Sequence, residues 1–286
     1  MQIRPEAKPV LKWAGGKRQL LVEILGQIAR LGPKKIGTYY EPFVGGAAVF
    51  FALSNEQRFE HARLSDRNGD LIGVYTELRD NVDQVIAELE KLRKLGHSEE
   101  TYYDVRKDVQ AARPAKGPGR AARIIYLNKT GYNGLYRVNR SGEFNVPFGR
   151  YKQPRILDPV RLRAAADALQ GVELVVEDFE QACRRAKRGD FVYFDPPYLP
   201  VSKTANFSAY HAEAFGRDEH RRLLREFEAL GKRGVGALLS NSDTDETRKL
   251  YERFTQHKVR ATRAINSKAT ARGAVSELLV QNRKSR

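Results

Sequence analysis

The sequence has few residues that could bind a metal or form a disulfide. Its 286 residues include one cysteine and five histidines. A single cysteine excludes a disulfide framework, and the scattered histidines lack the spacing of a zinc or iron–sulfur site. We therefore predict that the protein binds no metal, and such low cysteine usage is typical of a reducing compartment.

Long hydrophobic runs are also missing. The nearest candidate, the uncharged residues 42–55, is shorter than the roughly 18 apolar residues that a membrane span requires. Charged side chains, among them Glu6, Lys8 and Lys12, interrupt the N-terminus, so we expect no signal peptide and no membrane partner. The sequence predicts a soluble cytoplasmic protein.

Acidic residues are scarce relative to basic ones. The chain has 51 Lys and Arg against 35 Asp and Glu, a net charge of +16, and its pI is about 9.9. Such a charge favours a polyanionic partner, either nucleic acid or anionic lipid. Because 41% of the residues are hydrophobic, the charge belongs to a folded protein of one or two domains.

The order of predicted elements indicates an α/β fold. Strand-like segments at 36–40, 62–65, 172–176, 191–194, 235–240 and 278–280 alternate with helical patterns such as 47–53 and 217–230. Strands separated by helices are typical of a sheet with crossover connections. A long helical pattern at 71–95 and a basic loop at 113–120 interrupt this rhythm. We therefore predict one domain from residues 1–69 and 158–286, with a second domain inserted at 70–157.

A glycine-rich turn at residues 41–47 connects the first strand to a helix. Gly45 and Gly46 lack side chains, so a ligand could approach the exposed backbone N–H groups closely. Asp66 follows Gly46 by 20 residues, the spacing at which an acid can bind the hydroxyls of a ribose. The pair indicates a cofactor that contains adenosine, although a tight turn and a helix-capping Asp would look the same.

The second distinctive feature is the run Asp195, Pro196, Pro197 and Tyr198, which follows a buried-looking strand. Open α/β sheets bind ligands at the carboxyl ends of their strands. Two prolines keep the backbone extended and remove N–H donors, which leaves carbonyl groups available as acceptors. A carboxylate, a carbonyl and an aromatic ring together suit an exocyclic amino group on a base.

Several of these motifs resemble those of one enzyme family. Residues 11–17, the turn at 43–46, residues 128–150 and the run at 195–198 are similar, in the same order, to the Dam-type (D12 class) DNA adenine-N6 methyltransferases. The resemblance covers residues 8–75 and 124–280. It implies a Rossmann-like S-adenosylmethionine-dependent methyltransferase fold, with an inserted, mainly helical target-recognition domain that carries a β-hairpin. It also implies that the target adenine is flipped out of double-stranded DNA.

The resemblance implies roles for individual residues. Lys17 would bind the carboxylate of S-adenosylmethionine, Asp66 its ribose, and Asp178 with Phe179 its adenine. The full cofactor-binding set is Trp13, Ala14, Gly15, Lys17, Phe43, Gly45, Gly46, Asp66, Asp178, Phe179 and Asp195. The DNA-binding set is Lys12, Tyr132, Asn133, Leu135, Arg137, Asn139, Pro147 and Tyr151. One departure concerns Ala47, which stands where the family usually has glycine.

The chemistry of the motif predicts direct transfer. Asp195 and the carbonyl of Pro196 would accept both N–H groups of the adenine, while Tyr198 stacks on the base and Pro197 stiffens the loop. These bonds favour a pyramidal nitrogen whose lone pair points at the methyl group, so no covalent intermediate is needed. Methylation at cytosine C5 requires a cysteine nucleophile, and the lone Cys183 lacks that motif. Cytosine N4 is a closer chemical rival, but enzymes acting there more often carry Ser in place of Asp195.

The segment 128–155 has the features of a DNA-reading element. It contains six basic residues and one acidic residue, with aromatic residues between them. Residues 135–139 and 143–146 predict a β-hairpin, which places Leu135, Arg137 and Asn139 on one face. Such a ribbon fits the major groove, and Arg137 is our candidate for a bidentate contact to guanine. The resemblance to Dam-type enzymes makes GATC the expected target.

Two other functions stay open from the sequence. A non-catalytic DNA-binding protein could keep the same scaffold, and the adenine could belong to RNA, although a narrow A-form major groove would not admit the hairpin. We expect a monomer. We also expect residues 204–210 to close over the target adenine.

Overall fold

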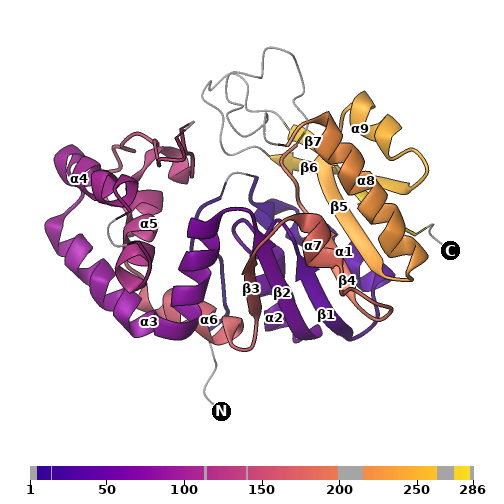
Figure 1. Cartoon of the computed structure of the whole chain (residues 1–286), viewed down its shortest axis with the longest axis horizontal. Helices are drawn as coiled ribbons and strands as arrows, with labels where there is room; N and C mark the ends of the chain where they lie inside the picture. Colours follow the sequence, from indigo (N-terminus) through magenta and orange to yellow (C-terminus); the bar gives the residue numbers. More distant parts are fainter. Residues whose placement is uncertain are drawn as a thin grey trace. The chain divides into compact units, whose positions relative to one another are not determined.

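The computed structural model describes residues 5–13, 15–112, 115–139, 141–198, 215–262 and 274–283. Ala14 and the loop 204–210 lie outside the described residues. The strands are β1 (Ile36–Glu41), β2 (Phe59–Asp66), β3 (Glu173–Val176), β4 (Phe191–Phe194), β5 (Gly236–Ser242), β6 (Thr255–Thr262) and β7 (Ala274–Gln281). The α-helices are α1 (Leu21–Leu31), α2 (Ala48–Asn55), α3 (Gly69–Leu95), α4 (Glu99–Gln110), α5 (Pro118–Thr130), α6 (Pro159–Leu169), α7 (Phe179–Cys183), α8 (Arg217–Lys232) and α9 (Asp245–Leu250). Short 3₁₀ turns η1 (Lys17–Gln19) and η2 (Tyr132–Gly134) complete the described elements (Figure 1).

The chain divides into two compact units. The first unit comprises Met1–Gly16, Gly45–Glu56 and Asn68–Val176. The second unit comprises Lys17–Val44, Gln57–Arg67 and Glu177–Arg286.

Within the second unit, the strands of the sheet follow the order β2-β1-β4-β5-β7-β6. Within the second unit, β1 pairs in parallel with β2 and β4, and β4 pairs in parallel with β5. β7 runs antiparallel to β5 and to β6. The predicted α/β class is therefore confirmed. Because β1, β2, β4 and β5 are parallel, their carboxyl ends meet at one edge, where open α/β sheets bind ligands.

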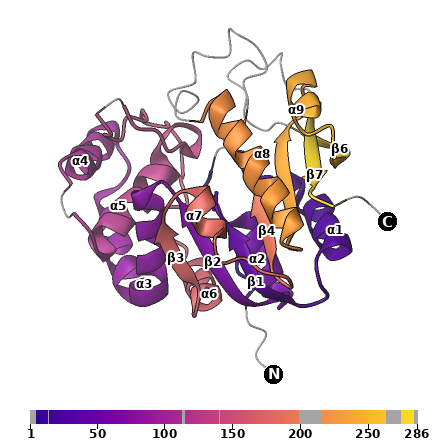
Figure 2. The same ribbon diagram turned by 45° about the vertical axis from the view of Figure 1, so that its right-hand side comes forward.

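The central strands of the second unit are buried along their whole length. All four residues of β4 and all seven of β5 are buried, as expected for parallel strands covered on both faces. Helix α8 runs along β5 in both views (Figures 1 and 2). It buries His220, Leu223, Phe227 and Leu230, which recur at helical spacing. This core fixes the strands whose ends carry the site.

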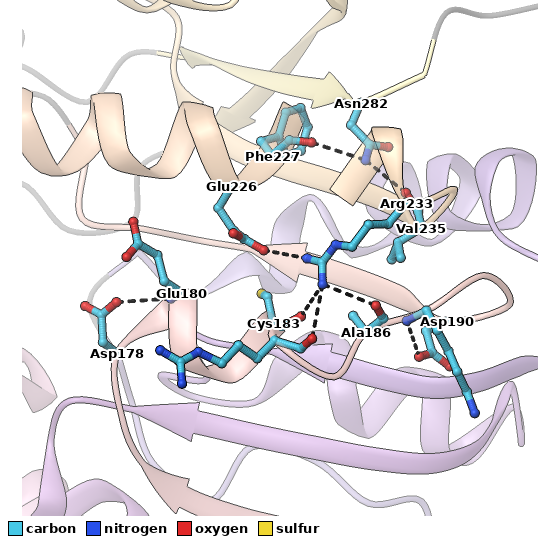
Figure 3. A network of polar contacts seen from close by, with 12 residues as sticks. Asp178, Glu180, Cys183, Ala186, Asp190, Glu226, Phe227, Arg233, Val235 and Asn282 are labelled. Carbon is cyan, nitrogen blue, oxygen red and sulfur yellow. Dashed lines mark hydrogen bonds and ion pairs between the residues drawn. The ribbon is translucent and has the colours of Figure 1, made fainter. Parts of the chain in front are cut away.

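Arg233 forms hydrogen bonds with backbone carbonyl groups at the end of α7 and in the residues that follow it. Its guanidinium donates to the carbonyl oxygens of Cys183, Arg184 and Ala186 at 3.2–3.4 Å (Figure 3). It also donates to Glu226 at 2.7 Å. The last carbonyl groups of a helix have no partner within the helix, so this guanidinium supplies the donors that α7 lacks.

Asn282, which follows the end of β7, also forms hydrogen bonds with backbone groups. Its side-chain oxygen accepts the N–H of Ala237 at 2.8 Å, and its amide donates to the carbonyls of Val235 and Phe227 at 3.0 and 3.5 Å (Figure 3). These buried contacts link the end of β7 to the start of β5 and to α8, which holds the register of the two strands.

The described part of the first unit is mainly helical. Helix α5 packs against both α3 and α4, and α6 packs against α3 (Figures 1 and 2). Helix α3 confirms the predicted long helix, and it bends at Asn81, where φ is −139°. Pro118 lies in the first turn of α5, where its missing N–H costs no hydrogen bond, so the predicted loop at 113–120 ends earlier than expected.

The predicted β-hairpin is present as a short antiparallel pairing. Val138 bridges Phe144, and the N–H of Asn139 donates to the carbonyl of Glu143 at 2.8 Å. A second bridge joins Gly131 to Phe148. The pairing consists of isolated bridges and does not extend into continuous strands. Among the residues that the structure describes, no helix combines the length and the apolar composition needed to cross a bilayer.

Candidate active site

Three parallel strands of the second unit deliver predicted site residues to one edge of the sheet. Asp66 ends β2, Phe43 lies two residues beyond β1, and Asp195 directly follows β4. Pro196 is buried and Pro197 is exposed. The sequence therefore places a carboxylate at the ends of two parallel strands and an aromatic ring at the end of a third.

An ion-pair cluster surrounds Asp195. The ammonium of Lys17 lies 2.8 Å from Asp195 Oδ1 and 3.6 Å from Glu277 Oε2, and its side chain is only 4% exposed. The hydroxyl of Tyr198 donates to Glu277 at 2.7 Å. The Lys17 ammonium also lies 4.7 Å from the centre of the Tyr198 ring. One ammonium thus contacts two carboxylates and the face of a tyrosine.

This environment tunes the protonation of the cluster. Burial raises the pKa of Asp195 to about 6, and the charge of Glu277 adds to that rise, while Lys17 and the Tyr198 hydroxyl oppose it. Asp195 is therefore ionised at neutral pH and is a hydrogen-bond acceptor. Burial, together with the charges of Asp195 and Glu277, raises the pKa of Tyr198 well above its ordinary value. Its phenol stays protonated and can donate.

A group of aromatic rings lies beyond β1 in the same unit. Phe43 stacks on Phe179 with ring centres 5.6 Å apart, and it meets Phe215 edge-on at 5.4 Å. Asp178 caps α7 by accepting the N–H of Glu180 at 3.0 Å. The predicted residues Phe43, Asp178 and Phe179 are thus brought together around the start of α7.

Arg222 reinforces this arrangement. Its guanidinium lies 5.0 Å from the centre of the Phe179 ring and 3.0 Å from the carboxylate of Asp178. The two carboxylate oxygens of Asp66 can accept hydrogen bonds from the hydroxyls of a ribose. The ring of Phe43 is partly exposed and suits contact with a flat base, whereas Phe179 is buried behind it. The acceptor carboxylate and the Phe43 ring are therefore compatible with a ligand that contains adenosine.

In the first unit, the glycine turn lies against Trp13. Gly45 has a φ of +45°, and a Cβ there would come 2.8 Å from Trp13 Cδ1. A Cβ on Gly46 would come 3.3 Å from Trp13 Cβ. The hydroxyl of Tyr75 holds the turn by donating to the carbonyl of Gly45 at 2.7 Å. Glycine is required at Gly45 because both its conformation and its close neighbour exclude a side chain.

Ala47 adopts a left-handed backbone conformation, which is the conformation that favours the glycine usually found at this position in the family. Its φ is 55° and its ψ is 31°, and α2 begins at Ala48, one residue later than predicted. The left-handed region costs an L-residue about 1–2 kcal/mol relative to the right-handed helix. The departure from the family pattern is therefore a site of backbone strain beside the turn.

Asn128 holds the segment that carries Lys12. Its side-chain oxygen accepts the N–H of Lys12 at 2.8 Å, and its amide donates to the carbonyls of Lys12 and Gly134 at 2.8 and 2.9 Å. The ammonium of Lys12 lies 4.5 Å from the centre of the Tyr151 ring. Two of the predicted DNA contacts, Lys12 and Tyr151, are thus neighbours.

The hairpin residues make contacts within the hairpin itself. Arg137 donates from Nε and Nη2 to the side chain and carbonyl of Asn145 at 2.7 and 3.0 Å. The side-chain oxygen of Asn139 accepts the N–H of Ser141 and of Glu143. Leu135 is half-buried. Arg137 is therefore paired with Asn145 across the hairpin.

Two predicted DNA contacts lie at the base of the hairpin. Tyr132 is 44% exposed, which is unusual for a large aromatic side chain, and Asn133 has a φ of 54°. The N–H of Tyr132 donates to the carbonyl of Pro147 at 2.9 Å, and Pro147 is exposed. An exposed aromatic ring on a fixed backbone is available to stack on a base.

The sequence did not single out Glu277 or identify the role of Asn128. Glu277 is 79 residues from its partner Tyr198, and Asn128 is 116 residues from Lys12. Only the pairing of distant segments reveals them. In the sequence, Glu277 and Asn128 stand out only as polar residues within hydrophobic segments. That pattern does not show which residue each of them contacts.

The described residues include neither a reactive cysteine thiol nor a metal site. Cys183 is buried in α7, and burial raises the pKa of its thiol well above the ordinary value, which makes it a poor nucleophile. Within the described ranges, no three His, Cys, Asp or Glu side chains gather as a metal site would require.

A parallel sheet with a carboxylate and aromatic rings at its carboxyl edge is the arrangement of Rossmann-like enzymes that bind nucleotide ligands. The chain belongs to the D12 class N6 adenine-specific DNA methyltransferases, because the model of that family matches residues 13–265. Both the predicted family and its Rossmann-like fold are thereby confirmed, and the protein is an adenine-specific DNA methyltransferase.

Curated relatives agree with this assignment. The Type II methyltransferase M1.LlaDCHI of Lactococcus lactis subsp. cremoris is 40% identical and covers 96% of this chain and 95% of its own. The Type II methyltransferase M.MjaIII of Methanocaldococcus jannaschii is 44% identical, with 97% and 99% covered. The DNA adenine methylase of Escherichia coli strain K12 is 38% identical, with 94% and 93% covered.

Proposed function

We propose that the protein transfers the methyl group of S-adenosylmethionine to N6 of an adenine flipped out of double-stranded DNA, at GATC sites. The observation that carries the proposal is the ionised, largely buried Asp195, which Lys17 holds at the carboxyl edge of the sheet and which Pro196 and Tyr198 follow. This combination supplies the acceptors and the aromatic surface that an adenine amino group requires.

The resemblance to the family assigns a role to each cofactor-binding residue. Asp66 would accept the ribose hydroxyls, and Phe43, Asp178 and Phe179 would surround the adenine. Trp13, Gly15, Gly45 and Gly46, with Ala14, would form the glycine-lined part of the site, and the Lys17 ammonium would pair with the cofactor carboxylate. When bound, S-adenosylmethionine supplies a methyl group on an electrophilic sulfonium.

The protein would activate the amino group by hydrogen bonding. Asp195 and the carbonyl of Pro196 accept the two N–H groups, while Tyr198 stacks on the base. The nitrogen then becomes pyramidal, and its lone pair is free to attack. Because Asp195 titrates near pH 6, its carboxylate can also accept the proton that the nitrogen loses after methylation. The buried Cys183 has no part in this route.

The inserted segment 70–157 would recognise the DNA. An amino group inside the duplex stack cannot reach Asp195, so the base must be flipped. Tyr132 and Asn133 would fill the space it leaves, and Lys12, Leu135, Arg137, Asn139, Pro147 and Tyr151 would contact the recognition sequence. The exposed ring of Tyr132 supports the first role, and the resemblance of residues 128–150 to Dam-type enzymes supports GATC.

Two relatives carry the name Type II methyltransferase, which supports a role in restriction-modification for this protein as well.

The test is a transfer assay with isotope-labelled S-adenosylmethionine and two duplexes, one with GATC and one with a single substituted base. Nucleosides from the digested DNA are separated and identified by mass spectrometry. We expect labelled N6-methyladenine from the GATC duplex alone, and none with Asp195→Ala, which should still bind DNA. Label in cytosine, or full activity of Asp195→Ala, would contradict the proposal. Equal labelling of both duplexes would refute GATC alone.

A further inference from the structure

We propose that Glu277 is a positioning residue for methyl transfer, because it anchors the Tyr198 phenol and shares the Lys17 ammonium with Asp195. The inference rests on the proposed function, in which Asp195 and Tyr198 bind the target adenine. It adds a residue that acts through its contacts with Lys17 and Tyr198.

The sheet itself fixes the position of Glu277. β7 runs antiparallel to β5, so the early residues of β7 lie beside the carboxyl end of β5, where Glu277 pairs with Ser242. Its side chain is 17% exposed. A glutamate held by strand pairing is a more rigid anchor than one carried on a loop.

The first task of Glu277 is to fix the orientation of Tyr198. Tyr198 follows two prolines, which provide no backbone N–H donors to tie the segment down. The 2.7 Å hydrogen bond from its hydroxyl to Glu277 fixes the far end of the ring. Both ends of the side chain are then held, and the plane of the ring is defined for stacking on a base.

The second task concerns the charge on Lys17. With Glu277 at 3.6 Å and Asp195 at 2.8 Å, the ammonium is shared between two carboxylates. Without Glu277, the ammonium would interact more strongly with Asp195, and the Asp195 carboxylate would become a weaker acceptor for the adenine amino group. The titratable groups that act on Asp195 are Lys17 of η1, Glu277 of β7 and the neighbouring Tyr198. Tyr193 of β4 and Tyr39 of β1 also couple to it.

The experiment compares Glu277→Gln with wild type in steady-state methyl transfer between pH 5 and pH 9. Glutamine keeps the size and an acceptor oxygen but removes the charge. We expect kcat to fall about 10- to 100-fold with KM for duplex DNA changed little, because misplaced groups lose transition-state contacts more than binding. The acid limb of the pH profile should move to lower pH, since the charge of Glu277 raises the pKa of Asp195. Glu252→Gln, at an exposed position of the same unit, is the matched control.

A second variant separates positioning from folding. Glu277→Ala and Tyr198→Phe remove the hydrogen bond between these two side chains from its two ends. The double variant should therefore lose no more activity than the less active of the two single variants, because residues that act through one contact are not additive. Additive losses, or a Glu277→Gln enzyme with wild-type kcat and pH profile, would overturn the inference. If the wild-type enzyme itself methylates no adenine, the proposed function fails instead.

Discussion

The ion pair between Lys17 and Asp195 makes a quantitative prediction about pH. With the pKa of Asp195 at about 6, the acceptor carboxylate is almost fully ionised at pH 7.5. At pH 5 only about a tenth of it is ionised, so the rate of transfer should fall about tenfold over this range. Removing the Lys17 ammonium should move this limb, because a charge of opposite sign 2.8 Å away favours the ionised carboxylate.

The direction follows from the charges. Lys17→Met leaves Asp195 buried and still beside Glu277, both of which raise its pKa. A positive charge at this distance lowers the pKa of a carboxyl group by about 1–3 units. The loss of Lys17 should therefore shift the acid limb of the pH–rate profile to higher pH by about that amount. Protonation then weakens Asp195 as an acceptor at neutral pH.

Single-turnover methyl transfer between pH 5 and pH 9, with the cofactor concentration raised until the rate no longer increases, measures this shift apart from cofactor affinity. Lys34→Met, at an exposed position of the same unit, is the control and should keep the wild-type profile. An acid limb that stays in place in Lys17→Met, or moves to lower pH, would refute the electrostatic role of Lys17.

Three further predictions concern the glycine turn, the Asn128 contacts and the charge of the protein. Gly45→Ala should lower cofactor affinity at least about tenfold, measured by calorimetry, because the turn must move away from Trp13. Gly26→Ala, in helix α1 with open space around it, should instead stabilise the protein by about 0.5–1 kcal/mol. Asn128→Ala removes three hydrogen bonds of a buried side chain and should lower the free energy of unfolding by about 2–4 kcal/mol in urea titrations, and unchanged stability would show that these bonds contribute nothing. Affinity for duplex DNA should fall steeply with salt, by about 10³-fold between about 50 and 200 mM if six phosphates are contacted, and a flat dependence would contradict a phosphate-binding role for the net charge of +16.

The sequence predicted the parts of the site that are local. Asp195 to Tyr198 are consecutive, and the strand before them is a hydrophobic run, so both the chemistry and its place at a strand end could be inferred. The same holds for the glycine turn after β1. Glu277 could not be inferred, because its role depends on the register between β5 and β7.

Edge positions and buried charges were harder to predict. Strand β6 could not be predicted from its hydrophobic pattern, because Thr255–Thr262 include basic and polar side chains, as edge strands often do. Lys129 was counted among the basic residues of the DNA-reading segment, but its ammonium donates to the carbonyl of Val10 and burial lowers its pKa to about 8. Net charge in a sequence does not distinguish a lysine that contacts phosphate from one that joins two segments.

The most direct test of the central claim is to map methylated adenines in a genome that lacks this modification, after expression of the wild-type protein and of Asp195→Ala. The account predicts N6-methyladenine at GATC sites with the wild-type protein and none above background with the variant. Adenine methylation that persists in Asp195→Ala, or a genome that stays unmodified although folded wild-type protein is expressed, would contradict it.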